Sequence, residues 1–393
     1  MPNIPFLYTR LDQLLKYLRS DETNRPLRRD ALREAFRTGQ WSVAKELIDE
    51  GLMHWPEDGD LLGSSSLMLM RAERYEEAEK VILRALEAGG DIPELRYNLA
   101  LSRFMQGQFS EALKQLEKDG CETLVPLSLL LRARCQYHLG MHDEAIADCA
   151  AYLRLAPQDA GGHGVLALFL YDQDNREMAA MHASLALERD PLQNEALLVR
   201  AATQHDGRNM ESALETYDLL IQSCPSSGRG RLGRALVNMG LRRLEAARSD
   251  AELASQLMPE HIGTWHVLGW LQILQNDVKG AERSFRSALA LDRGFAETHG
   301  GLAVVAALSG REGEARSSIR RARGLDSQGS SVQFAEFVLL RQAGQDDAAR
   351  ELFEAFLDKP MRGGERPYRE LLALKMLGGP AEDSIESHKP TLH

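Results

Sequence analysis

The chain has 393 residues, of which 44% are hydrophobic and 27% are charged, so it can bury a core and is not disordered as a whole. Its length suits two or three globular domains or one extended repeat array. The formal net charge of −11 argues against nucleic acid as the default partner. Only nine of the 47 basic residues are lysine, and this arginine bias hints at a bacterial source.

The N-terminal segment contains no basic stretch followed by a long apolar run, so we expect no signal peptide. No segment reaches the roughly 18 apolar residues that a membrane span needs. The four cysteines give no sign of an oxidising compartment, and we expect free thiols in a cytoplasmic protein. They are Cys121, Cys135, Cys149 and Cys224.

Small residues and prolines recur along the chain at a constant spacing. Prolines close four consecutive units, at Pro157, Pro191, Pro225 and Pro259. An alanine precedes the end of each unit at a fixed distance, at Ala44, Ala78, Ala112, Ala145, Ala179, Ala213, Ala247, Ala281, Ala315 and Ala349. One junction near residue 124 is a residue short. A period of about 34 residues indicates a repeat array, here of about ten units.

In chain order, residues 5–20 predict an N-terminal capping helix, assigned to residues 1–24. Residues 25–360 predict the array, in which each unit is two amphipathic helices joined by a tight turn. In the fourth unit PLSLLLRARCQYHLG is a first helix that stops at Gly140, and HDEAIADCAAYLRLAP is a second helix that stops at Pro157. Residues 361–379 predict a C-terminal capping helix, and the polar residues 380–393 a disordered tail. No segment shows a strand pattern.

A glycine, Gly269, interrupts the first helix of the eighth unit, where glycine costs about 0.5–1 kcal/mol relative to alanine. Trp265-x-x-Leu268-Gly269, followed by Ala281, Phe285 and Ala288, resembles the signature of the tetratricopeptide repeat family. In that family a small residue at the eighth position lets the two helices of a unit approach closely. The resemblance implies that packing against the small residue of the second helix offsets the cost of Gly269.

The resemblance covers residues 25–360 and implies an all-α fold, a right-handed α-solenoid superhelix with capping helices. It also implies a concave groove lined by the first helices, with five positions of each first helix facing a ligand. Carrying those positions over gives the candidate groove residues Tyr97, Phe104, Tyr137, Tyr171, His205 and Trp270. Such side chains would bind a peptide or an amphipathic helix. The alternative is that they pack one first helix on the next.

Three arginines, Arg29, Arg33 and Arg37, follow one another at a spacing of four and share one helical face. They are further candidates for the groove, where they could hold a carboxylate, a phosphate or an acidic peptide. Members of the family that bind chaperone tails hold a peptide carboxylate at the positions that Arg29 and Arg33 occupy. Ser64 and Glu94 depart from the rest of that binding pattern. The alternative is a solvated face neutralised by nearby acidic residues.

The sequence GRGRLG (228–233) matches the dinucleotide-binding pattern G-x-G-x-x-G. That pattern requires a preceding strand, whereas ESALETYDLLIQSCP predicts a helix and its stop, so we interpret the match as a coincidence. Arginines cluster here and in the ninth unit, at Arg229, Arg231, Arg234, Arg242, Arg243, Arg248, Arg316, Arg320, Arg321 and Arg323. An acidic partner or a balance of surface charge is the preferred interpretation, with nucleic acid or lipid headgroups as the alternative.

No sequence motif of a hydrolase, kinase or nucleotide-binding loop is present. His138 and His142 straddle the helix stop at Gly140, which spoils metal-binding geometry, so we expect no metal and no cofactor. We therefore predict a non-enzymatic scaffold, adaptor or chaperone that binds a protein or peptide partner. The alternatives are a bacterial chaperone for secretion or envelope assembly and a regulatory subunit of a separate enzyme, such as a glycosyltransferase.

Overall fold

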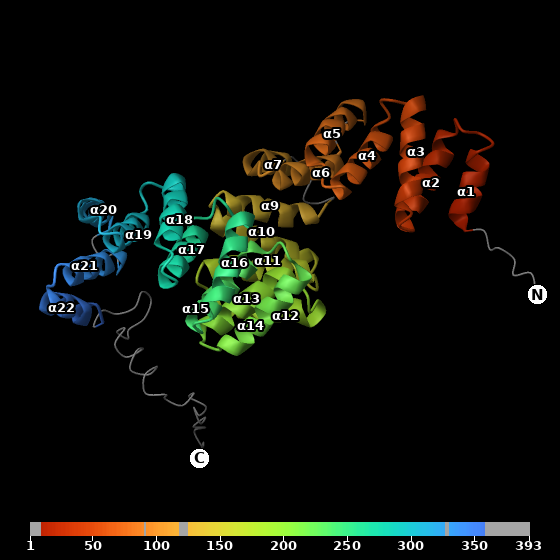
Figure 1. Ribbon diagram of the computed structural model, residues 1–393. Coiled ribbons are helices and arrows are strands. Elements are labelled where there is room, and N and C mark those ends of the chain that lie inside the picture. The colour runs from red at the N-terminus through yellow and green to blue at the C-terminus, as the bar shows by residue number, and fades with distance from the viewer. Residues whose placement is uncertain (1–8, 90–91, 118–124, 327–329, 358–393) are drawn as a thin grey trace, which may run out of the picture. The chain divides into compact units, whose positions relative to one another are not determined.

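The computed structural model describes residues 9–89, 92–117, 125–326 and 330–357. Across these ranges it contains 21 helices and no strand, so the expected all-α class is confirmed. The chain divides into two compact units, Met1–Thr203 (unit 1) and Gln204–His393 (unit 2). Figure 1 labels the helices along the chain.

Helices of unit 1 follow the predicted alternation of first and second helices. They are α1 (Arg10–Leu18), α2 (Arg25–Arg37), α3 (Trp41–His54), α4 (Gly59–Arg71), α5 (Tyr75–Gly89), α6 (Pro93–Met105), α7 (Phe109–Leu116), α9 (Leu127–His138), α10 (His142–Leu155), α11 (Ala160–Asp172) and α12 (Arg176–Arg189). The division between the units falls inside α13 (Asn194–Asp206).

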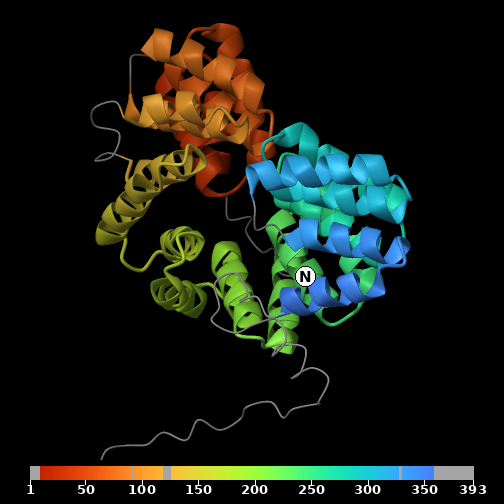
Figure 2. The same ribbon diagram turned by 90° about the vertical axis from the view of Figure 1, so that its left-hand side faces the viewer.

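Helices of unit 2 continue the same alternation. They are α14 (Met210–Ser223), α15 (Gly228–Gly240), α16 (Leu244–Leu257), α17 (Ile262–Leu274), α18 (Val278–Leu291), α19 (Ala296–Leu308), α20 (Glu312–Leu325), α21 (Ser330–Gln342) and α22 (Asp346–Leu357). Helices α19 to α22 stack against one another, as Figure 2 shows in blue and cyan.

Ten residues with positive φ, one per repeat, lie in the turns between the two helices of each unit. They are Gly39, Glu73, Gly107, Gly140, Asp174, Arg208, Arg242, Asn276, Gly310 and Gly344, with φ between 57° and 79°. Successive turns keep the spacing of the alanines, with one shorter step between Gly107 and Gly140, so the predicted period is confirmed in the backbone. A left-handed residue ends a helix by turning its last carbonyls toward the next N–H groups.

Several helices begin at a polar cap that the chain supplies just before the first turn. Asp159 accepts the N–H of Gly162, Ser227 accepts that of Gly230, and Asp277 accepts that of Gly280. These bonds satisfy N–H groups that a helix cannot pair internally. Turn and cap residues together therefore set both ends of the repeated helix pair.

Gly269 packs against the large side chain of Phe285, a contact that the sequence did not predict. A Cβ atom at Gly269 would lie 2.8 Å from Cζ of Phe285, whose side chain is fully buried. Gly301 of α19 approaches the same ring, because a Cβ there would lie 2.5 Å from Phe285 Cε1. The two glycines therefore make room for one phenyl ring between α17, α18 and α19.

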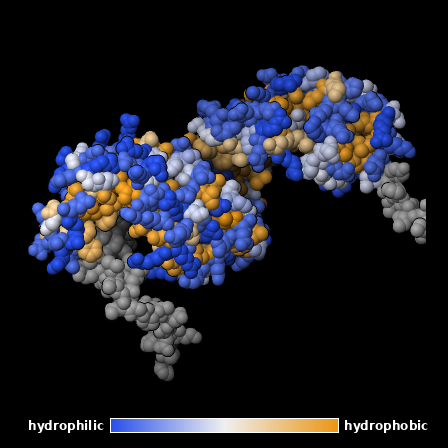
Figure 3. All heavy atoms as spheres, viewed as in Figure 1, coloured by the Kyte–Doolittle hydropathy of each residue, from blue (hydrophilic) through white to orange (hydrophobic). Residues whose placement is uncertain are grey.

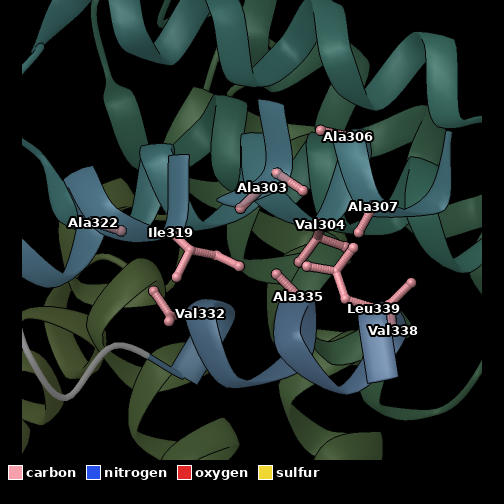
Figure 4. Close-up of a cluster of buried hydrophobic side chains, with 11 residues drawn as sticks. Ala303, Val304, Ala306, Ala307, Ile319, Ala322, Val332, Ala335, Val338 and Leu339 are labelled. Atoms are coloured by element: carbon pink, nitrogen blue, oxygen red, sulfur yellow. The ribbon is translucent and has the colours of Figure 1, made fainter. Parts of the chain in front are cut away.

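Buried apolar clusters lie between consecutive helices of each unit. In unit 2, Val304 of α19, Ile319 of α20 and Leu339 of α21 converge, with small alanines between them, as Figure 4 shows. Alanines let the helices approach, and the branched side chains fill the remaining space. Figure 3 shows that hydrophobic residues also reach the surface of both units, set among hydrophilic ones.

The predicted N-terminal capping helix corresponds to α1, which a reciprocal hydrogen bond between Thr9 and Asp12 begins. The predicted array corresponds to α2 through α22. The predicted capping helix at 361–379 and the predicted tail at 380–393 lie outside the described residues. Of the helices in the described part of the chain, none has both the length and the apolar character that crossing a membrane requires.

Candidate functional site

The three arginines of α2 each lie beside a carboxylate. Arg29 lies 2.5 Å from Asp60, Arg33 3.1 Å from Asp30, and Arg37 2.6 Å from Glu34. Two of these carboxylates belong to α2 itself, so this helix largely neutralises its own arginine face. Whether the arginines also contact a partner stays a prediction.

The aromatic residues of unit 1 join neighbouring repeats. The Phe104 ring of α6 meets His138 of α9 edge to face at 5.7 Å between centroids. The Tyr137 ring of α9 stacks on the buried Phe169 of α11 at 4.3 Å, and the Tyr137 hydroxyl donates to Asp172. Contacts of this kind hold one first helix on the next.

The remaining candidates make other contacts, although Tyr97 shares an apolar cluster with Phe104. Tyr97 packs at the edge of the apolar cluster around Leu113, and the guanidinium of Arg176 lies 4.0 Å above the Tyr171 ring. His205 is half-buried near the end of α13. Their role in binding a partner stays a prediction.

Trp270, the last of the predicted groove residues, lines an apolar pocket in unit 2. The pocket has a volume of about 360 Å³ and lies between α17, α21 and α22. The Trp270 ring lies 6.3 Å from that of Phe334, which in turn stacks near Phe337 at 6.4 Å. Phe353 of α22 completes this aromatic wall, 5.7 Å from Phe337. Phe334 and Phe353 remain 41% and 43% exposed, so the wall is open to a ligand.

One residue of the pocket wall is large where the preceding repeats carry a small residue. Phe337 lies one full repeat after Ala303, at the place in the repeat where Gly269 lies in α17. Its phenyl ring lines the pocket and lies beside Phe353 of α22.

Two polar atoms in the pocket lining are buried and have no partner in the described part of the chain. They are Oγ of Ser331 and Oε1 of Gln333. A buried polar atom without a hydrogen bond costs about 1–3 kcal/mol, so both would gain from a ligand that supplies a donor or an acceptor. Apolar walls with a few convergent polar groups are typical of binding sites.

The comparisons with known proteins agree with the repeat pattern. The family model described as tetratricopeptide repeat matches residues 29–93 and 267–330. A second model, for subunit 3 of the anaphase-promoting complex, or cyclosome, matches residues 71–148. The chain contains tetratricopeptide repeats. No curated protein matches the sequence.

Solved structures of tetratricopeptide-repeat proteins resemble the chain in fold. Human IFIT1, solved as a dimer with m7Gppp-AAAA, is 14% identical over 88% of this chain and 92% of its own, with a TM-score of 0.54. PilF of Pseudomonas aeruginosa is 15% identical over 52% of this chain and 94% of its own, with a TM-score of 0.45. At such identity the likeness concerns the fold alone. Tetratricopeptide repeats typically form non-catalytic scaffolds for protein interaction.

Other motifs of the sequence lie within the packed repeats. All three glycines of GRGRLG are buried in helix α15, where a Cβ at Gly233 would lie 2.3 Å from Tyr217. Burial raises the pKa of the Cys135 and Cys149 thiols to about 12, so neither is a nucleophile. His138 stacks on Phe109 at 4.2 Å. Within the described ranges no cluster of three metal-ligating side chains occurs.

Sequence reasoning singled out Trp270, whose role in binding stays a prediction, and did not foresee the other residues that line this pocket of the tetratricopeptide array. The missed residues are Phe334, Phe337, Phe353, Ser331 and Gln333. One signal was available, since Phe337 breaks the run of small residues at the eighth position. The sequence does not tell which side chains lie around Phe337, because that depends on how α17, α21 and α22 pack.

Proposed function

We propose that the protein is a tetratricopeptide-repeat scaffold that holds a segment of a protein partner in the Trp270 pocket. The supporting observation is the combination of an open aromatic wall with the unpaired polar atoms of Ser331 and Gln333. A peptide matches both features, because its apolar side chains can pack against the aromatic wall and its backbone N–H groups can donate to Gln333 Oε1.

The chemistry of the lining defines the segment that fits. Leu274, Phe334 and Phe353 offer exposed apolar area, and none of the lining residues in the described part of the chain carries a charge. A leucine, methionine or phenylalanine of the partner would therefore bind here, whereas a charged side chain would lose its hydration without gaining an ion pair. The arginines of α2 and the aromatic residues of unit 1 are proposed as additional contacts.

The finer roles differ in how they would use this pocket. A chaperone for secretion or envelope assembly would hold a short apolar segment of several clients in turn. A regulatory subunit, of a glycosyltransferase for example, would hold one partner in constant stoichiometry. The nucleotide ligand named for human IFIT1 suggests RNA as a further ligand class, but the uncharged pocket does not favour phosphate. A cytoplasmic location and a bacterial source belong to the same proposal, supported by the composition alone.

The test is site-specific photo-cross-linking of the full chain in its native cells. Benzoylphenylalanine replaces Phe334 in the pocket, and in a control chain it replaces Leu253, which is similarly exposed on α16 but outside the pocket. We expect an adduct with another protein from position 334 alone, mapping to an apolar segment of that protein.

Two outcomes would contradict the proposal. Equal adducts from positions 334 and 253 would show that partners contact the surface without preference for the pocket. An adduct from position 334 to residues 361–379 of the same chain would show that the predicted capping segment fills the pocket. Substitution of Trp270 by alanine should abolish the specific adduct, since it removes the opposite wall.

A further inference from the structure

A second groove in unit 2 lies on a different face of α21 and has a different character. It has a volume of about 420 Å³ and lies between α20, α21 and α22. Its apolar floor is formed by Ile319, Leu339, Leu340 and Leu352. Unlike the Trp270 pocket, this groove has charged side chains around its rim.

Three arginines of α20 line the rim, and their charges are not fully neutralised. Arg316 pairs with Glu312 at 2.7 Å, and Arg323 pairs with Glu336 at 2.7 Å. Arg320 is exposed, lines the groove, and forms no ion pair within the described residues. The groove therefore presents an excess of positive charge on a protein whose net charge is −11.

An apolar floor beneath guanidinium groups selects one class of ligand. Single-stranded nucleic acid binds where bases stack on aromatic side chains, and none of the described residues that line this groove is aromatic. An amphipathic helix with leucines on one side and glutamates beside them matches both features, because arginine binds carboxylates in forked pairs. Burial of its apolar side would also exclude water from those pairs.

We propose that this groove binds an acidic amphipathic segment of a protein partner through lining residues that, apart from Leu352, differ from those of the Trp270 pocket. An apolar side chain of the segment enters the floor, and its carboxylates pair with Arg316, Arg320 and Arg323. This second surface would let one unit hold two partner segments at once.

The experiment measures binding of a labelled helical peptide by fluorescence anisotropy, with the full chain. The peptide has about four turns with leucine and glutamate at helical spacing. A control peptide has the same charge but serine in place of leucine, and a second control is single-stranded polyadenylate. We expect binding of the leucine peptide alone.

Two charge reversals on α20 form a matched pair. Arg320→Glu changes a residue of the groove, whereas Arg321→Glu makes the same change at an exposed neighbour outside it. We expect about tenfold weaker binding for Arg320→Glu. Arg321→Glu should weaken binding by about twofold or less, because exposed charges away from the contact are screened. Phe334→Ser in the Trp270 pocket should leave the peptide affinity unchanged, so the two sites fail separately.

Each opposite result overturns the proposal. Equal losses for Arg320→Glu and Arg321→Glu would show nonspecific attraction, and no binding by the unchanged chain would exclude the ligand class. Preference for polyadenylate would assign the arginines to nucleic acid. Tighter peptide binding after replacement of Glu382, Asp383 and Glu386 by glutamine would identify the chain's own acidic segment as the occupant.

Discussion

Arg134 of α9 and Glu195 of α13 form an ion pair that joins the first helices of two repeats that are not neighbours. Arg134 Nη2 lies 2.5 Å from Glu195 Oε1, and Gln193 donates to the other oxygen of this carboxylate at 2.6 Å. Gly164 of the intervening α11 leaves the space, because a Cβ there would lie 2.1 Å from Gln193 Oε1. A glycine in the middle repeat thus permits contact between the repeats on either side.

Trp270 and Phe334 repeat this relationship in unit 2. They belong to α17 and α21, and Gly300 of the intervening α19 lies against Ser331, whose Oγ would be 1.8 Å from a Cβ at Gly300. The same geometry produces an ion pair in one unit and the wall of an open pocket in the other. The side chains that a repeat presents there decide whether the helices are joined by an ion pair or border a pocket.

The Arg134–Glu195 pair should contribute measurably to stability, because both side chains are partly buried. Burial raises the pKa of Glu195, but the charge and hydrogen bond of Arg134 outweigh it, and the pKa lies below its ordinary value. We expect Glu195→Ala to lower the free energy of unfolding by about 1–3 kcal/mol. The loss should be smaller when Arg134 is already alanine, which urea unfolding in a double-mutant cycle would measure.

An exposed ion pair supplies the control for that cycle. Arg33 pairs with Asp30 on α2, with Arg33 79% exposed, and Asp30→Ala should change the free energy of unfolding by about 0.5 kcal/mol or less. A loss for Asp30→Ala as large as that for Glu195→Ala would refute the role of burial.

Replacing a helical glycine by alanine should raise or lower the free energy of unfolding, depending on the space around the glycine. Gly301→Ala would force a methyl group to 2.5 Å from the buried Phe285 ring, and we expect a loss of about 1–3 kcal/mol from overpacking. Gly313→Ala in α20 meets no atom within 4 Å and should stabilise the helix by about 0.5–1 kcal/mol. Chemical denaturation of both variants checks the signs, and a stabilised Gly301→Ala would contradict the packing described for Phe285.

Substitutions at two left-handed turn residues should change the free energy of unfolding in opposite directions. Arg208 has a φ of 62° without being glycine, so Arg208→Gly should raise the free energy of unfolding by up to about 1 kcal/mol. Gly140 has a φ of 79°, and Gly140→Ala should lower it by about 1 kcal/mol. Denaturant midpoints that move in the same direction for both variants would mean that turn strain does not control stability here.

A pair of histidines in unit 1 should make stability depend on pH. His163 Nε2 donates to the carbonyl of Pro157 at 3.2 Å, so its Nδ1 accepts from Nδ1 of His182 at 2.9 Å. Burial, followed by the effect of His163, holds the pKa of His182 below its ordinary value of 6.5. The folded state therefore favours the neutral ring, and the unfolded state binds more protons as the pH falls.

We expect the neutral His163–His182 contact to stabilise the folded state fully above pH 6.5, and this stability to be lost as the pH falls below that value. The melting temperature should drop between about pH 7.5 and 5.5, because protonation of His182 favours the unfolded state. His182→Gln keeps a donor but cannot titrate, so its melting temperature should fall less over the same range. An identical pH dependence in both proteins would exclude the pair as its source.

A constant period with regular small residues and stops specifies a helix pair through local rules, so the repeat unit follows from the amino-acid pattern alone. Turn glycines such as Gly140 and the small eighth position of Gly269 are recognisable in that pattern, because each acts within a few helical turns. The contact of Gly269 with Phe285 could not be predicted in this way, since a helical pattern does not tell which side chain of α18 faces the glycine.

The contacts between repeats could be read only from the folded structure. Trp270 and Phe334 are almost two repeats apart in sequence, and their rings lie 6.3 Å apart, with Gly300 of the intervening α19 against Ser331 of α21. Phe353 of α22 lies 5.7 Å from Phe337 and completes the same wall. Such contacts depend on the rotation and separation of several packed helices, and these follow from the summed packing of many side chains rather than from the period of any one segment.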